Sequence, residues 1–135
     1  MNINIDFVNK LRNSGLRPTK QRLKICEVLF NTEKTFHFTV NDLSKIISEK
    51  LNQKISLATV YNTVHAFKKK GYLKEISMNS EKTYFDTNTS HHHHFFDSST
   101  KELTDLSDDQ VEKIKINKAL PGKKISSVEI LVKVE

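Results

Sequence analysis

The feature of this 135-residue chain with the clearest chemistry is a run of four consecutive histidines, His91 to His94. Imidazole nitrogen is a good ligand for zinc, iron, manganese and haem iron. In an extended segment successive side chains point to opposite sides, so His92 and His94 face one way and His91 and His93 the other. The run can therefore supply two separate sites. The alternatives are a purification tag, which a short internal run does not favour, and a solvated polar loop.

Carboxylates that can complete such sites flank the run, at Asp86, Asp97, Asp105 and Glu112. Another histidine, His37, lies far away in the N-terminal half of the chain. If His37 joins the cluster, a bound metal ion would clamp the two halves of the chain together. The remaining histidine, His65, lies within a predicted helix, and we expect it at the surface or facing a partner rather than as a ligand.

The single cysteine, Cys26, excludes an intrachain disulfide and any structural CxxC zinc site. This cysteine usage is typical of a cytosolic protein. No apolar run reaches the ~20 residues that a membrane helix needs. The N-terminal segment lacks the continuous apolar core of a signal peptide. We expect a cytoplasmic protein that contacts no membrane.

Charge is distributed unevenly along the chain, whose formal net charge is +6. Residues 1–86 carry 15 basic and 8 acidic side chains, whereas residues 87–135 carry 7 and 8. An excess of positive charge in one part is typical of a nucleic-acid partner, although a solvated lysine-rich surface would look similar. We expect two small domains with these bounds. Domains of this size bury little surface, which favours a homo-oligomer.

The N-terminal half has apolar residues at helical spacing in residues 3–13, 19–30, 39–51 and 56–70. Thr19, Thr39 and Ser56 are suitable N-caps, and Gly71 is a suitable C-cap for the last helix. Two strand-like segments, 72–77 and 82–86, follow and are joined by a turn at 78–81. The last three of these helices, followed by a two-stranded hairpin, are typical of a winged helix-turn-helix.

The helix that begins at Ser56 is the predicted DNA-reading helix, because the second helix of a helix-turn-helix lies in the major groove. Its expected apolar stripe is Leu57, Val60, Tyr61, Val64 and Phe67. Its other face can donate and accept hydrogen bonds at base edges and phosphates through Ser56, Thr59, Asn62 and Thr63. Tyr61 is ambiguous, because its ring can pack inward while its hydroxyl reaches DNA. The phosphate-binding candidates are Arg17 and Lys20, with Arg12 and Arg22 nearby. An ordinary amphipathic helix is the alternative.

The C-terminal part has a β-β-α-β pattern. Strands are expected at Phe95-Phe96 and Leu103–Leu106, around a turn at 97–101. A helix is expected from the cap at Ser107 to about Lys118, where Pro121 and Gly122 end it. The alternating segment 125–134 predicts a last strand. The fold class is thus α+β, with a winged helix followed by a small αβ domain.

Four stretches together resemble the ferric uptake regulator (Fur) superfamily: GLRPTKQRLKICEVLF, SLATVYNTVHAF, KTYFDTNTSHHHHFFD and LTDLSDDQVEKI. A histidine run followed directly by two aromatics is similar to the iron response regulator (Irr) branch. The resemblance implies a homodimeric transcription regulator that binds a double-stranded DNA operator through the winged helix and dimerises through the αβ domain. It further implies a response to iron status, as haem or a divalent metal (Fe, Mn or Zn), and control of iron and haem homeostasis genes.

The resemblance also implies ligand sets. The principal metal site maps onto His37, Asp86, His92, His94 and Asp105. A second site maps onto His91, His93 and Glu112, and the haem candidates are His92, His93 and His94. The second site is incomplete, because Val128 stands where the family usually has a further histidine.

Two further departures concern DNA and haem. Asn62 replaces the arginine that usually follows the recognition tyrosine, which favours a different operator. Cys26 is followed by Glu27, so the Cys-Pro haem motif of some Irr proteins is absent.

Three other functions compete with this interpretation. A member of the same family can sense manganese, zinc or peroxide instead of iron. A metal storage or transfer protein would need the histidines but not the winged helix. A metalloenzyme is disfavoured, because the chain has no HExxH motif and no evident nucleophile, and we expect no enzymatic activity.

Overall fold

A computed structural model describes residues 4–78 and 80–135, which form two compact units, Met1–Thr89 and Ser90–Glu135. Each unit has its own three-stranded sheet. Ile3 of the expected first helix and Asn79 of the expected hairpin turn lie outside the described residues. None of the helices in the described part of the chain has the length and apolarity needed to span a membrane.

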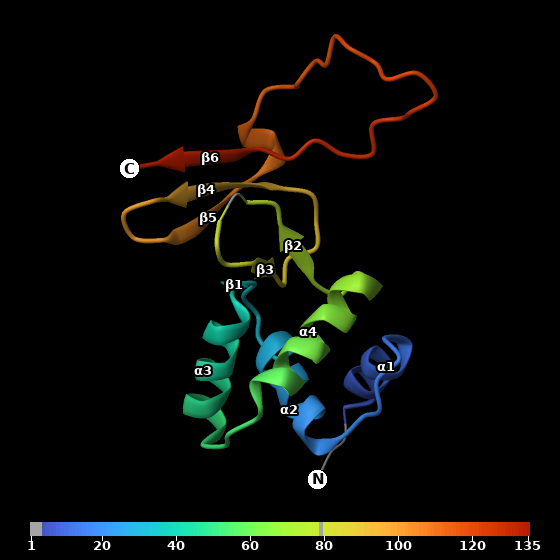
Figure 1. The fold of residues 1–135 in the computed structure, drawn as a ribbon, viewed down its shortest axis with the longest axis vertical. Helices are drawn as coiled ribbons and strands as arrows, with labels where there is room; N and C mark the ends of the chain where they lie inside the picture. Colours follow the sequence, from blue (N-terminus) through green and yellow to red (C-terminus); the bar gives the residue numbers. More distant parts are fainter. Residues whose placement is uncertain (1–3, 79) are drawn as a thin grey trace. The chain divides into compact units, whose positions relative to one another are not determined.

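The first unit contains four helices, α1 (Ile5–Asn13), α2 (Lys20–Phe30), α3 (Val40–Leu51) and α4 (Leu57–Lys70) (Figure 1). The predicted caps are confirmed: the hydroxyls of Thr19, Thr39 and Ser56 each accept a backbone N–H in the first turn that follows. At the end of α4, Gly71 has φ of 93°, a left-handed conformation that glycine adopts without strain. The beginning and end of the predicted DNA-reading helix are therefore set by local sequence.

The core of the first unit lies where the four helices meet, and α4 buries Val60, Thr63, Val64 and Phe67 in it. The expected stripe was wrong at Leu57, which is 50% exposed, and Tyr61, which the sequence left ambiguous, is 51% exposed. A helix turns about 100° per residue, so Tyr61 stands to one side of the buried face. Leu57 lies in the first turn, at the end of the helix.

The sheet of the first unit has the order β1-β3-β2, with both pairs antiparallel. Its strands are β1 (His37–Phe38), β2 (Lys74–Ile76) and β3 (Tyr84–Asp86). The two strands of the hairpin were predicted, whereas β1 was not. A two-residue strand shows no alternation, and its pairing with β3 is a tertiary contact that local sequence does not reveal.

The sheet of the second unit has the order β5-β4-β6. β4 (His93–Asp97) pairs antiparallel with β5 (Glu102–Leu106) and parallel with β6 (Leu131–Val134). The turn between β4 and β5 forms where it was expected. Hydrogen bonds that Ser99 donates from its hydroxyl and its backbone N–H to Asp97 hold the pKa of that carboxyl below its usual value.

The helix expected from Ser107 to about Lys118 is wrong. A short 3₁₀ helix, η1 (Asp108–Gln110), follows Ser107, and the described residues between η1 and β6 form no helix or strand (Figure 1). The capping box between Ser107 and Gln110 does form. A helix in a protein depends mainly on burying an apolar face, and here Ile114, Ile116 and Leu120 are exposed.

Cys26 is expected to be unreactive in the folded protein. Its side chain is buried in α2, and burial raises the pKa of the thiol to about 12, so little thiolate forms at pH 8. We expect the native thiol to react with Ellman's reagent at least about 100-fold more slowly than the thiol of the guanidinium-unfolded chain. Similar rates in the two states would show that Cys26 is exposed in solution.

Candidate metal ligands and the DNA-facing helix

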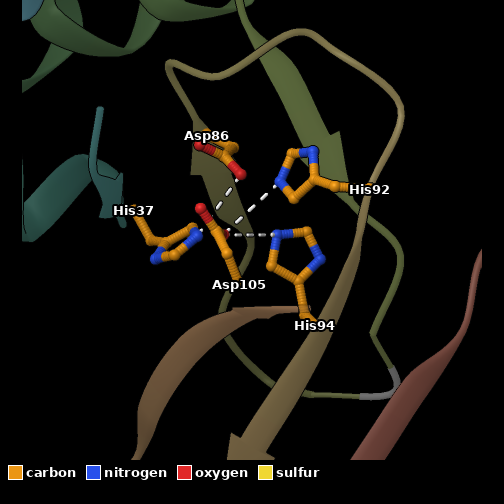
Figure 2. A group of neighbouring side chains, drawn as sticks. All are labelled: His37, Asp86, His92, His94 and Asp105. Atoms are coloured by element: carbon orange, nitrogen blue, oxygen red, sulfur yellow. Dashed lines mark ion pairs between the residues drawn. The ribbon is translucent and has the colours of Figure 1, made fainter. Parts of the chain in front are cut away.

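His37 and Asp86 form a cross-strand pair in the first unit. They stand opposite each other in the β1–β3 register, and His37 Nε2 lies 3.3 Å from Asp86 Oδ2. Figure 2 shows the imidazole and this carboxylate joined by an ion pair. The Asp86 side chain is only 1% exposed, and its Oδ1 accepts the Asn88 backbone N–H. The sheet thus fixes two of the predicted principal ligands side by side.

His92, His94 and Asp105 form a comparable group in the second unit. His94 stands opposite Asp105 in the β4–β5 register, and His92 lies two residues before His94, on the same side of the extended chain. Nε2 of each histidine lies 3.5 Å from the same Asp105 oxygen, Oδ1. The two imidazole centroids are 4.5 Å apart. Figure 2 shows both rings directed at this carboxylate.

The spacing of these donor atoms fits metal coordination. Two ligands that each lie about 2.1 Å from one ion are about 3 to 3.4 Å apart in octahedral or tetrahedral geometry. The His37–Asp86 and histidine–Asp105 distances, 3.3 and 3.5 Å, are close to that range. His92 Nδ1 donates to the Ser90 carbonyl at 2.7 Å, which leaves the Nε2 lone pair directed at Asp105. Both groups therefore suit a divalent ion.

The opposite face of the histidine run carries a different group. His91, His93 and Asp108 place their donor atoms within 4.8 Å of one another. Glu112, the expected carboxylate, is exposed and lines the same cavity of about 360 Å³. Asp108 was missed by the sequence analysis. Its position in the sequence could have indicated it, because the β4–β5 hairpin places Leu106 opposite His93 and Asp108 follows Leu106 by two residues.

The hydrogen bonds of this second group do not fit a metal site. The Ile130 backbone N–H donates to His93 Nδ1 at 3.0 Å, so the ring proton lies on Nε2, which is 3.0 Å from Asp108 Oδ1. His93 therefore has no free lone pair to give to a metal ion. His91 Nε2 donates to the carbonyl of Val128, the residue that replaces the expected histidine ligand. The group ties β4 to η1 and to the segment before β6.

Of the residues of α4 and its N-cap that were predicted to contact DNA, the structure buries one. Ser56, Tyr61 and Asn62 are exposed and Thr59 is half-buried. These four side chains are therefore accessible to a DNA partner. Thr63 was a wrong choice, because it is fully buried and its hydroxyl donates to the Thr59 carbonyl at 2.7 Å.

The phosphate-binding candidates of the first unit are accessible. Arg17 lies before α2 and Lys20 begins it, and both side chains are exposed. Arg22 is half-buried, and its guanidinium donates to the Arg17 carbonyl at 3.0 Å. Arg17 and Lys20 are thus free of the core.

The sequence profile of the ferric uptake regulator family matches residues 13–133 of this chain. The chain belongs to this family. A ferric uptake regulation protein of Yersinia pestis is 36% identical over 81 residues, which are 60% of this chain and 53% of that protein. The peroxide-responsive repressor PerR of Staphylococcus epidermidis is 33% identical over 84 residues, 62% of this chain and 54% of that protein. The chain spans about half the length of the curated relatives it matches.

Among solved structures, the ferric uptake regulator of Vibrio cholerae covers 95% of this chain and 98% of its own, with 25% identity and a TM-score of 0.72. This likeness confirms the predicted α+β fold class of the Fur family. The matched relatives include ferric uptake regulators and peroxide-responsive repressors. Family membership therefore leaves open which signal this member senses.

Proposed function

We propose that this chain is a metal-responsive, DNA-binding transcription regulator of the Fur family that acts as a homodimer. The observation that carries the proposal is that each unit presents its own group of histidine and aspartate donors at metal-ligand spacing. His37 and Asp86 belong to the first unit, and His92, His94 and Asp105 to the second. The first unit offers two donor residues and the second offers three, so the two parts together would give a divalent ion five protein ligands.

The proposed regulation follows from this division. A bound divalent ion supplies a positive centre that both imidazoles and carboxylates can share. His37 and Asp86 then hold it from the first unit, while His92, His94 and Asp105 hold it from the second. Because all five side chains must meet, the segment that connects the units adopts fewer conformations. The result is a population shift among arrangements of the two units.

The shift would reach DNA through α4. A homodimer presents two such helices to successive major grooves of a roughly palindromic, A·T-rich operator, and their separation decides the fit. Ser56, Thr59, Tyr61 and Asn62 would contact bases or phosphates, and Arg17 and Lys20 would contact phosphates. Metal would thus change DNA affinity by selecting the separation between the two helices.

Dimerisation is supported by exposed apolar side chains in the second unit. Ile114, Ile116, Leu120 and Ile125 lie in the segment between η1 and β6 and are 39–62% exposed. Apolar groups gathered in one segment are usually covered in a soluble protein. We infer that a second copy of this chain covers them, which makes the second unit the dimerisation domain.

Iron is the proposed signal, and an ion is favoured over haem. Three imidazoles with two carboxylates suit Fe, Mn or Zn. The likeness of the histidine run to the Irr branch favours iron, and the relatives' names leave peroxide sensing as the second candidate. All three haem candidates, His92, His93 and His94, are buried, so haem would need these rings to be uncovered. A haemin titration of the wild type and of a variant with His91–His94 changed to alanine separates the two signals, because only specific haem ligation gives a Soret band that the variant loses.

The direct test is metal-dependent DNA binding. A duplex is first selected by the metal-loaded protein from a random pool and then used in fluorescence anisotropy with metal-free protein and with added Mn²⁺, Fe²⁺ or Zn²⁺. The proposal requires selective binding that changes with metal. A protein that enriches no sequence under any of these conditions is not a DNA-binding regulator.

Asn62→Ala is expected to weaken specific DNA binding by about 10-fold or more, because a bidentate amide contact to adenine is worth about 1–3 kcal/mol. Asn62 is exposed on α4 and belongs to neither group of candidate ligands, so the metal content should not change. Anisotropy titrations on the selected duplex and metal analysis of the purified variant measure the two quantities. If specific affinity survives intact, α4 is not the reading helix.

A further inference from the structure

His65 lies between two aromatic rings of the first unit. Its ring centroid is 4.1 Å from that of Tyr61, one helical turn earlier on α4, with the planes tilted by 38°. It also meets Phe85 of β3 edge-on, at 5.5 Å and 86°. Tyr61, His65 and Phe85 form a stack, here called the ring column, that runs from the sheet to the exposed side of α4.

The base of the ring column is fixed. Phe85 is fully buried and stands opposite Phe38 in the β1–β3 register. The Phe38 and Phe85 rings stack with centroids 5.8 Å apart. His65, which is half-buried, therefore rests on a rigid support, and the half-exposed Tyr61 rests on His65.

Open space lies beside the ring column. A cavity of about 280 Å³ is lined by Tyr61, His65 and Phe85, by the start of α3 at residues 39–41, and by residues 81–83 of the hairpin. The Tyr61 ring is therefore not enclosed on this side by close packing. Without the imidazole the space would be larger, and the phenol would have more rotamers available to it.

We propose that His65 is a positioning residue for DNA recognition, whose ring holds the Tyr61 phenol in the orientation that reaches DNA. The inference rests on the proposed function, because it requires that α4 reads DNA. His65 acts through Tyr61 and not by touching DNA. The Phe85 edge supplies the fixed reference for this positioning, since Phe85 belongs to the sheet and not to α4.

The test uses the full chain and the duplex that the wild type selects from a random pool. His65→Ala is expected to weaken binding about threefold to tenfold, the range of one lost aromatic contact. His65→Phe, which keeps a ring, is expected to restore most of the affinity. In a Tyr61→Ala background, His65→Ala should have no further effect. Thermal unfolding of each variant shows that it is folded.

A second measurement needs no DNA. Incorporated 3-fluorotyrosine gives a ¹⁹F signal for each of the three tyrosines, and Tyr61→Phe identifies the signal of Tyr61. The ring current of the imidazole should shift this signal, so His65→Ala should move it more than the signals of Tyr72 and Tyr84.

Three results would overturn the inference while the proposed function stands: unchanged affinity in a folded His65→Ala variant, an equal loss in the Tyr61→Ala background, or no rescue by phenylalanine. An unmoved Tyr61 signal would also overturn it, because the ring contact would then be absent in solution. If the wild type selects no duplex, the proposed function fails and the inference fails with it.

Discussion

Replacing His92 and His94 together by alanine is expected to abolish the response of DNA binding to metal. Both rings direct Nε2 at Asp105, at 3.5 Å, and we propose both as ligands of the principal site. Losing a partner that only orients a ligand already costs about 10–100-fold in metal affinity, so losing two ligands should cost more than about 100-fold. Competition with a chromophoric chelator measures the affinity, and anisotropy with and without metal measures the response.

The matched control is the pair His91 and His93, which belongs to the same run but faces the other way. Changing these two to alanine removes the same number of imidazoles and should leave the principal-site affinity within a few-fold of the wild type. His93 is buried and bonded to Ile130 and Asp108, so some loss of stability is expected in the control. Equal loss of metal affinity in both double variants would show that the two faces of the run do not serve separate purposes.

The alternation that separates these two pairs could be read from the sequence, and so could the closeness of His94 to Asp105. The turn at 97–101 was predicted, and a hairpin around it brings His94 near Asp105; the exact register, which pairs the two residues, could not be read from the turn alone. Short-range pairing of this kind depends on local turn residues, among them Asp97, whose carboxylate accepts hydrogen bonds within the turn. The candidate ligands of the second unit were therefore accessible to sequence reasoning.

The pairing of His37 with Asp86 could be proposed only from the family resemblance. These residues are 49 positions apart, and the short strand β1 that brings them into register has no periodic signal of its own. The prediction that Thr63 contacts DNA was wrong for a related reason. Its polar side chain suggested an exposed position, but the packing of α4 buries it, and its hydroxyl donates a hydrogen bond to the Thr59 carbonyl.

The helix expected after Ser107 failed because local signals are not sufficient. The capping box formed, and three lysines and several apolar residues follow it, but Ile114 and Ile116 are β-branched and exposed. Without a surface to bury against, helix propensity alone is marginal at this length. The winged-helix pattern was a more reliable guide to the fold class, since it draws on many residues.

Phe67→Ala is expected to destabilise the first unit by about 3–5 kcal/mol. Phe67 is fully buried on α4 and makes edge-on contacts with Phe30 of α2, at 5.5 Å, and with Tyr72, at 6.0 Å. A loss of this size is a large part of the roughly 5–15 kcal/mol that a folded domain has in total. Guanidinium unfolding followed by circular dichroism measures the change.

Lys69→Ala is the control for Phe67→Ala, because Lys69 lies on the exposed side of the same helix and should change stability by no more than about 0.5 kcal/mol. A loss below about 1 kcal/mol in Phe67→Ala would mean that α4 is not anchored through this ring. The same helix carries Asn62 and Tyr61 on its exposed side, so a weakened anchor should lower DNA affinity even where no DNA-facing residue has changed. Measuring DNA affinity at several temperatures separates the two effects. Phe67→Ala should regain affinity as the temperature is lowered within the range where its folded fraction rises, whereas Asn62→Ala should not.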